Sequence, residues 1–210
     1  MILDFEKLSQ RVAYNWMIEA ITPRPIAWVS TISADGHTNL APFSFFQGVC
    51  AKPPTLLFTA VNNRAGVKKD TVRNIEVTSE FVVNIVPYAL AEPMNATSAG
   101  LPHGESEFAH FGIASAASVA VRPPRVAAAP VAFECRLDRI VLVGEGASGA
   151  NVVFGTILRA HIADTVLGTD GHLDPKKLDT IGRMGGDFYA RTTELFVVHR
   201  PPDGSSQRAT

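Results

Sequence analysis

The sequence predicts a mainly β fold, an antiparallel barrel or sandwich to which a few helices are added. Short apolar and β-branched runs follow one another along the chain, and turn residues such as Asp35-Gly36 separate them. Residues 131–137 alternate apolar and polar side chains, which is typical of a half-buried strand. Because only one clearly periodic helix and a few short ones interrupt the strands, an alternating βαβ arrangement is not expected.

The N-terminal half begins with an expected amphipathic helix over residues 5–14. The prolines of Thr22-Pro23-Arg24-Pro25 forbid a helix there. The run IAWVSTIS is apolar on both faces, which predicts a buried strand. Pro42 predicts that the strand containing it is an edge strand or has a bulge or bend at this position, because proline cannot donate a hydrogen bond to a neighbouring strand. The strands expected in this half cover residues 26–33, 38–48 and 56–61.

A helix is expected over residues 66–78, because Val67, Thr71 and Ile75 recur at helical spacing. The alanine-rich segment 88–121 predicts short helices and loops. The segments expected to follow are strands at 81–86, 131–143 and 152–162, a helix at 174–181 that Gly185-Gly186 ends, an extended stretch at 188–198 and a frayed tail over 201–210.

Length and composition exclude several classes of protein. The 210 residues suit one domain, with its core at about 12–198. Nineteen basic and twenty acidic residues leave no electrostatic case for nucleic acid or an anionic membrane. Cys50 and Cys135 form neither a disulfide framework nor a zinc motif. No signal peptide or membrane span is visible, so a cytoplasmic protein is expected.

One motif points to a different function and is rejected on physical grounds. Residues 144–149 spell G-x-G-x-x-G, and Asp164 follows at the spacing of a dinucleotide fingerprint. That function requires a helix to start at the glycines, so that its N-terminus meets the pyrophosphate. The β-branched residues after Asn151 predict a strand instead, and therefore a glycine-rich hairpin loop. The sequence shows no metal-binding pattern, P-loop or nucleophile motif.

Polar residues gather in three stretches within this apolar chain. Residues 30–44 carry hydroxyls and an amide across the first hairpin, where buried polar groups must find partners. Residues 62–71 place Arg64, Lys68 and Lys69 near a helix start, which favours an anion site but also fits a solvated helix face. Residues 183–189 contain glycines that let backbone approach a flat ligand or a partner, or that cap a helix.

Taken together, these stretches resemble the flavin reductase-like proteins. The segments that carry the resemblance, in the family's order, are RPIAWVST (24–31), Asp35-Gly36, NLAPFSFF (39–46), KPP (52–54), KKDTVRNI (68–75), FVVNIV (81–86), PPRVAAAPVAFEC (123–135) and MGGDFYAR (184–191). The resemblance implies an antiparallel, Greek-key-type split β-barrel that binds FMN, or FAD, close to the interface of a homodimer.

The resemblance also implies roles for individual residues. Those that would line the flavin are Ser30, Thr31, Ile32, Asn39, Ala41, Pro42, Phe43 and Ser44. The phosphate would be held by Arg64, Lys69, Thr71 and Arg24. Phe188 and Tyr189 would approach the ring, from the same or the other subunit. No residue is assigned a catalytic role, because the flavin itself accepts hydride from NADH or NADPH.

The expected function is therefore an NAD(P)H-dependent flavin oxidoreductase that passes electrons to a monooxygenase or another electron-transfer partner. Three alternatives share the same barrel. They are an FMN electron carrier without NAD(P)H activity, a non-catalytic dimeric ligand-binding module, and an oxidase of the pyridoxamine-phosphate type.

Overall fold

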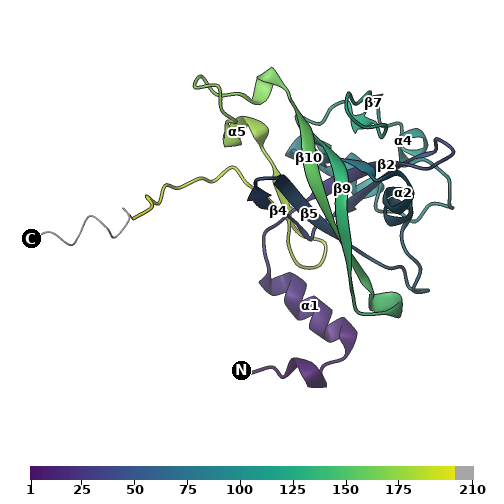
Figure 1. The fold of residues 1–210 in the computed structure, drawn as a ribbon. Coiled ribbons are helices and arrows are strands. Elements are labelled where there is room, and N and C mark those ends of the chain that lie inside the picture. Colours follow the sequence, from purple (N-terminus) through teal and green to yellow (C-terminus); the bar gives the residue numbers. More distant parts are fainter. Residues whose placement is uncertain (202–210) are drawn as a thin grey trace, which may run out of the picture.

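A seven-stranded antiparallel sheet with the strand order β3-β2-β6-β9-β10-β5-β4 forms the centre of the computed structural model (Figure 1). Its strands are β2 (Ala27–Ile32), β3 (Thr38–Phe43), β4 (Phe46–Ala51), β5 (Pro54–Val61), β6 (Glu80–Ile85), β9 (Val131–Val143) and β10 (Ala150–Ile162). The structure describes residues 1–201, so most of the expected frayed tail lies outside the described residues. The mainly β prediction is confirmed.

Helices and small sheets surround this sheet. The helices are α1 (Gln10–Ala20), α2 (Asp70–Thr78), α3 (Ala91–Ala96), α4 (Glu107–His110) and α5 (Pro175–Leu178), with short 3-10 turns at Phe5–Lys7, Tyr88–Leu90, Gly146–Ser148 and Asp164–Val166. The small sheets join β1 (Arg24–Pro25), β11 (Ile181–Arg183) and β12 (Tyr189–Arg191), and β7 (Ser115–Ala116) with β8 (Arg125–Val126). Among the described residues, no helix is long and apolar enough to cross a membrane.

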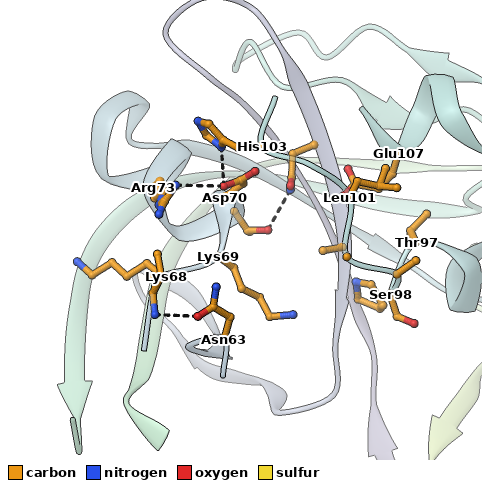
Figure 2. A pocket seen from close by; sticks show the side chains of 17 residues that line it. Asn63, Lys68, Lys69, Asp70, Arg73, Thr97, Ser98, Leu101, His103 and Glu107 are labelled. Carbon is orange, nitrogen blue, oxygen red and sulfur yellow. Dashed lines mark hydrogen bonds and ion pairs between the residues drawn. The ribbon is translucent and has the colours of Figure 1, made fainter. Parts of the chain in front are cut away.

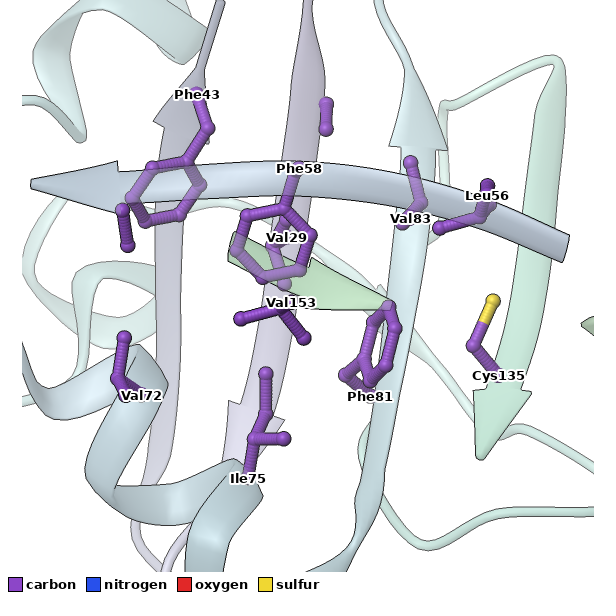
Figure 3. Packing of buried hydrophobic residues seen from close by; sticks show 12 residues of the cluster. Val29, Phe43, Leu56, Phe58, Val72, Ile75, Phe81, Val83, Cys135 and Val153 are labelled. Carbon is purple, nitrogen blue, oxygen red and sulfur yellow. The ribbon is translucent and has the colours of Figure 1, made fainter. Parts of the chain in front are cut away.

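The main core fills the space between the curved sheet and α2. Figure 3 shows Phe58 and Val153 at its centre, with Val72 and Ile75 of α2 pointing toward them. These two α2 residues are three positions apart and therefore share one face of the helix. Both are fully buried, so the apolar spacing that predicts a helix also explains why α2 packs here.

A second core covers the opposite face of β2. Ala27 and Val29 point into the main core. Trp28 lies between them on the strand, so its side chain points to the opposite face and packs among side chains from the segment 88–129. Its ring nitrogen donates to the Thr97 hydroxyl at 2.9 Å. Because apolar layers cover both faces of β2, the buried strand expected from the run IAWVSTIS is confirmed.

A buried carboxylate anchors the segment that leads into β8. Glu134 of β9 is fully buried and accepts hydrogen bonds from the backbone N–H groups of Val119, Ala120 and Val121. The His161 ring on β10 contacts the same oxygen as the Val119 N–H, Oε1 of Glu134, at 2.5 Å. Burial alone would raise the pKa of Glu134, but these hydrogen bonds outweigh burial and hold the pKa below its ordinary value.

Pro42 lies in an edge strand, as the sequence predicts. The expected single strand over 38–48 is divided into β3 and β4, because the chain bends at Ser44 and Phe45. The Phe45 carbonyl accepts the backbone N–H of Thr59 on β5 at 2.8 Å. This bend carries β4 across to β5, so that β3 and β4 occupy opposite edges of the sheet.

Other boundaries differ from the prediction for local reasons. The first helix runs to Ala20, because Pro23 disfavours helix only in the residues next to it. Helix α2 begins at Asp70, after a turn in which Gly66 has a positive φ. Helix α5 ends at Leu178, and Gly185-Gly186 lie in the turn between β11 and β12 instead of ending a helix. Only Tyr189–Arg191 of the expected extended stretch forms a strand. The G-x-G-x-x-G segment forms a hairpin loop, as expected.

Gly155 allows β10 to approach the core closely, which leads to a stability prediction. A Cβ added at Gly155 would lie 2.8 Å from Cε1 of Phe81 and closer still to its Cζ. Phe81 is fully buried and cannot move without displacing the core. We expect Gly155→Ala to lower the free energy of unfolding by about 1–3 kcal/mol in urea denaturation.

A matched control for this substitution is Gly48→Ala in β4. A Cβ at that position would meet nothing within 4 Å. Equal urea midpoints for the Gly155→Ala protein and the unsubstituted protein would contradict the close packing of Phe81 against β10.

Candidate functional site

A groove runs along the free edge of β3. Its deeper part is a cavity of about 410 Å³ between β3, the N-terminus of α2 and the loop 97–103 (Figure 2). The backbone N–H of Leu40 points away from β2 and donates to Glu107 at 2.8 Å. Alternate residues of an antiparallel strand face the same side, so Pro42 also has its backbone directed toward this free edge. No ladder hydrogen bond is therefore lost by placing a proline there.

One end of the groove has the properties of an anion site. Helix α2 begins beside it. Lys69 occupies the N-cap position of this helix, and no side-chain hydrogen bond caps the helix there. The Lys69 carbonyl accepts from Val72 and Arg73, which leaves the N–H groups of the first turn directed out of the helix. The positive end of the helix dipole and the Lys69 ammonium therefore favour a negatively charged ligand at this position.

The other charged side chains around this end are already paired. The Lys68 ammonium contacts Glu76, and Asp70 contacts both Arg73, at 3.6 Å, and His103, at 2.8 Å. Within residues 1–201, Lys69 has no ion-pair partner, and its nitrogen lies 5.8 Å from the centre of the Phe43 ring. Lys69 is thus the cation that this arrangement leaves for a ligand.

Two buried hydrogen bonds fix α2 to the hairpin of β2 and β3. The Asn39 amide donates to the Thr71 hydroxyl at 2.9 Å, and the Asn74 amide donates to the Thr31 hydroxyl at 3.0 Å. All four residues are buried. Because an unpaired buried polar group costs about 1–3 kcal/mol, these bonds hold the helix N-terminus in a defined position beside the strand edge.

The groove extends to a smaller cavity near the opposite end of β3. This second cavity, of about 220 Å³, shares the lining residues Pro42 and Ser98 with the first, so the two adjoin. The Tyr189 hydroxyl contacts the Asn95 amide oxygen at 3.2 Å in its wall. The Arg183 guanidinium lies 4.6 Å from the centre of the Tyr189 ring. The remaining lining residues of this part are Tyr14, Ile26, Ser44 and Met94.

The structure brings about half of the expected site residues together. Those that line the deeper cavity are Asn39, Ala41, Pro42, Lys69 and Thr71. Pro42 also lines the smaller cavity, together with Ser44 and Tyr189. Thr31 and Phe43 lie directly behind this surface, the first bonded to α2 and the second in the main core beneath Lys69.

The remaining expected residues lie elsewhere. Ser30 points to the opposite face of β2 from Thr31 and donates to the Pro124 carbonyl. Ile32 is half-buried and does not line the groove. Arg64 lines a separate apolar cavity beside α1, and Phe188 is 76% exposed outside the groove.

Arg24 has a structural role that its charge did not reveal. It is buried, and its guanidinium donates to the carbonyls of Ile18, Ile21 and Met184. Burial lowers its pKa. These bonds join the end of α1 to the turn between β11 and β12. The Nε of Arg24 donates to the Ser44 hydroxyl at 3.4 Å, so the donors of Arg24 are taken up by the chain itself, one of them by a residue that lines the groove.

Sequence reasoning missed the wall that faces β3. It consists mainly of the loop 97–103 together with Glu107, and Asn63 and Asn95 add polar groups at its margins. The turn-forming run Gly100-Leu101-Pro102-His103-Gly104 marks a loop, but loop composition does not reveal which strand edge the loop covers.

Comparison with known proteins connects this geometry to a family. Residues 20–177 match the family model described as a flavin reductase like domain. The chain is similar to nitrilotriacetate monooxygenase component B from Bacillus cereus, with 30% identity, a TM-score of 0.89 and coverage of 94% of this chain and 98% of that one. The chain is also similar to 2-nitrobenzoate 2-nitroreductase NbaA of Pseudomonas fluorescens, with 27% identity, a TM-score of 0.86 and coverage of 96% of each chain.

A third comparison concerns the fold alone. A split-barrel protein of Shewanella frigidimarina shares 22% identity and a TM-score of 0.81, over 96% of this chain and 100% of that one. The β3 edge, at which the sheet stays open beside α2, is the place where the groove lies. With its domain match and its split barrel, the chain belongs to the flavin reductase-like family.

Proposed function

We propose that this protein is an FMN-dependent oxidoreductase, which takes hydride from NADH or NADPH and passes the electrons to an acceptor. The observation that carries the proposal is the groove along β3. One end offers a helix N-terminus and Lys69, which has no ion-pair partner among residues 1–201, and the other end is smaller and holds an aromatic side chain. This order of chemistry matches a molecule with a phosphate at one end and a planar ring at the other.

The residues present fit FMN in this orientation. Lys69, the Thr71 hydroxyl and the first N–H groups of α2 would hold the phosphate. Pro42, Ser44 and Tyr189 would lie beside the ring. A cavity of about 410 Å³ is within the usual size range of small-molecule sites.

The role of the protein in the reaction is to bind and orient. Bound flavin supplies the hydride chemistry. Helix α2 and β3 fix the two ends of the groove relative to each other through the Asn39–Thr71 bond. We assign no side chain of the groove as nucleophile or general acid. Similarity to a monooxygenase component supports a separate oxygenase as the acceptor of electrons.

We further propose that two copies of the chain associate through α1. This helix has no buried residue, and its Tyr14, Trp16 and Met17 side chains are 37–47% exposed. An apolar cavity of about 660 Å³ opens between α1 and the barrel. Figure 1 shows α1 standing away from the sheet. Apolar surface of this kind marks a protein interface.

The hydride reaction can be tested by absorbance spectroscopy. We expect the purified protein to retain yellow colour after incubation with FMN and desalting, and to lose that colour when NADH or NADPH is added without oxygen. Colour that persists after both additions would instead favour an electron carrier that receives electrons from another protein. Failure to retain any flavin would favour a weakly bound flavin substrate or a non-flavin binding module.

The phosphate site makes a separate prediction about affinity. We expect Lys69→Ala to weaken FMN binding about tenfold or more, because a hydrogen bond to a charged group is lost. Riboflavin has no phosphate, so its affinity should stay the same. Fluorescence titration with both flavins measures the difference. Lys68→Ala is the matched control, because the Lys68 ammonium is paired with Glu76. An equal loss for both flavins would place the phosphate elsewhere.

Association through α1 predicts that a charge on its apolar face separates the copies. Sedimentation velocity should show a dimer for the unsubstituted protein and a monomer for Met17→Glu, because Met17 lines the apolar cavity. Asn15→Glu places the same charge on the same helix outside the residues that line the cavity and should leave the dimer intact. A monomeric unsubstituted protein would refute the association.

A further inference from the structure

Glu107 is an unusual residue to find in a groove that receives a phosphate. It is the first residue of α4 and is only 7% exposed, yet it lines the deeper cavity. Figure 2 shows it on the wall opposite Lys69, beside Leu101. A buried carboxylate would repel a phosphate placed next to it, so its presence calls for a different ligand group at this position.

One carboxylate oxygen of Glu107 has a clear structural role. Its Oε2 accepts a hydrogen bond from the backbone N–H of Leu40 at 2.8 Å, which gives this N–H on the free edge of β3 a partner. The other oxygen, Oε1, accepts no hydrogen bond from another residue in the described part of the chain. The backbone N–H of Glu107 itself also bonds to the carboxylate. Because Glu107 lines the deeper cavity and a carboxylate has about four acceptor positions, Oε1 keeps acceptor capacity for a ligand there.

The register of β3 places Glu107 between the two ends of the groove. Asn39 lies at the anion end through its bond to Thr71, and Pro42 lies where the two cavities join. Leu40, to which Glu107 is bonded, is located between them. In FMN, the part between the phosphate and the ring is the ribityl chain, a polyol whose hydroxyl groups are hydrogen-bond donors.

We infer that Glu107 binds the ribityl chain of the flavin, with its Oε1 accepting a hydrogen bond from a ribityl hydroxyl. This inference rests on the proposed FMN function and adds the residue that holds the middle of the cofactor. The two charged side chains then bind different parts of the ligand. Lys69 attracts the phosphate to one end, and Glu107 favours uncharged hydroxyls beside β3 and disfavours a phosphate there.

The electrostatic surroundings are compatible with this role. Burial raises the pKa of Glu107 above its ordinary value, although the backbone N–H groups of Leu40 and of Glu107 itself act against burial. The neighbouring Asp70 raises this pKa and Lys69 lowers it. A hydroxyl can donate to the charged carboxylate and can also bond to the neutral acid. Contact with a polyol is therefore possible in either protonation state.

A series of three ligands tests this inference on the full chain. FMN has the phosphate, the ribityl chain and the ring; riboflavin lacks the phosphate; and lumiflavin lacks the ribityl chain as well. We expect Glu107→Ala to weaken FMN and riboflavin about tenfold or more, as for other hydrogen bonds to a charged group, and to leave lumiflavin unchanged. Fluorescence titration gives the three dissociation constants.

Two further variants keep the result interpretable. Glu107→Gln retains an acceptor for Leu40 and a polar group toward the cavity, so it should fold normally and lose less affinity than Glu107→Ala. Glu105 lies two residues before Glu107, and its exposed carboxylate does not line the deeper cavity. Glu105→Ala should therefore change none of the three affinities. Thermal melting of each variant reports on folding.

The outcomes separate this inference from the function on which it rests. A loss that includes lumiflavin would mean that Glu107 only supports the wall, and it would overturn the inference. If Glu107→Gln bound FMN more tightly and the other two ligands equally well, the carboxylate would face the phosphate. That result would also overturn the inference. An unsubstituted protein that binds none of the three ligands would refute the flavin site as a whole.

Discussion

The open edge of β3 is the constraint on which the rest of the site depends. Pro42 has no N–H group, so a further strand cannot pair regularly along this edge, and the sheet ends there. An unpaired edge must be covered by other means, because exposed strand edges recruit other chains. Here the loop 97–103 and Glu107 provide the cover. They stand off from the strand instead of pairing with it, and the space that remains is the groove.

The polar side chains of the first hairpin serve mainly to hold this edge in place. Thr31 and Asn39 are bonded to α2, so the helix N-terminus cannot shift relative to β3 without leaving buried groups unpaired. Ser30 is bonded on the opposite face to the segment before β8. Several hydroxyl and amide groups that the resemblance assigns to a cofactor therefore already make hydrogen bonds within the fold. Of these residues, Asn39 and Thr71 also line the deeper cavity, and Ser44 lines the smaller one.

Local sequence information was sufficient for some features and not for others. The strands and the edge position of Pro42 follow from alternation and from the missing N–H of proline, both of which act within a few residues. The resemblance implies a phosphate-binding role for Arg24 and Arg64, but a match of motifs does not reveal that Arg24 donates to the carbonyls of Ile18 and Ile21. The wall at 97–107 is not predictable in this way, because its contacts with β3 join residues 67 and 68 positions apart.

The two walls of the groove differ in how they are held. Strand β3 and α2 are continuous with the main core, so opening that wall would expose the largest apolar cluster among residues 1–201. The opposite wall is tied to the barrel through separate side-chain bonds, among them Thr97 to Trp28 and His103 to Asp70. Breaking such bonds costs far less than unfolding a core, so local opening is expected first in this wall. The end of the groove beside α2 thus has the more firmly held frame, because its residues are tied to the main core.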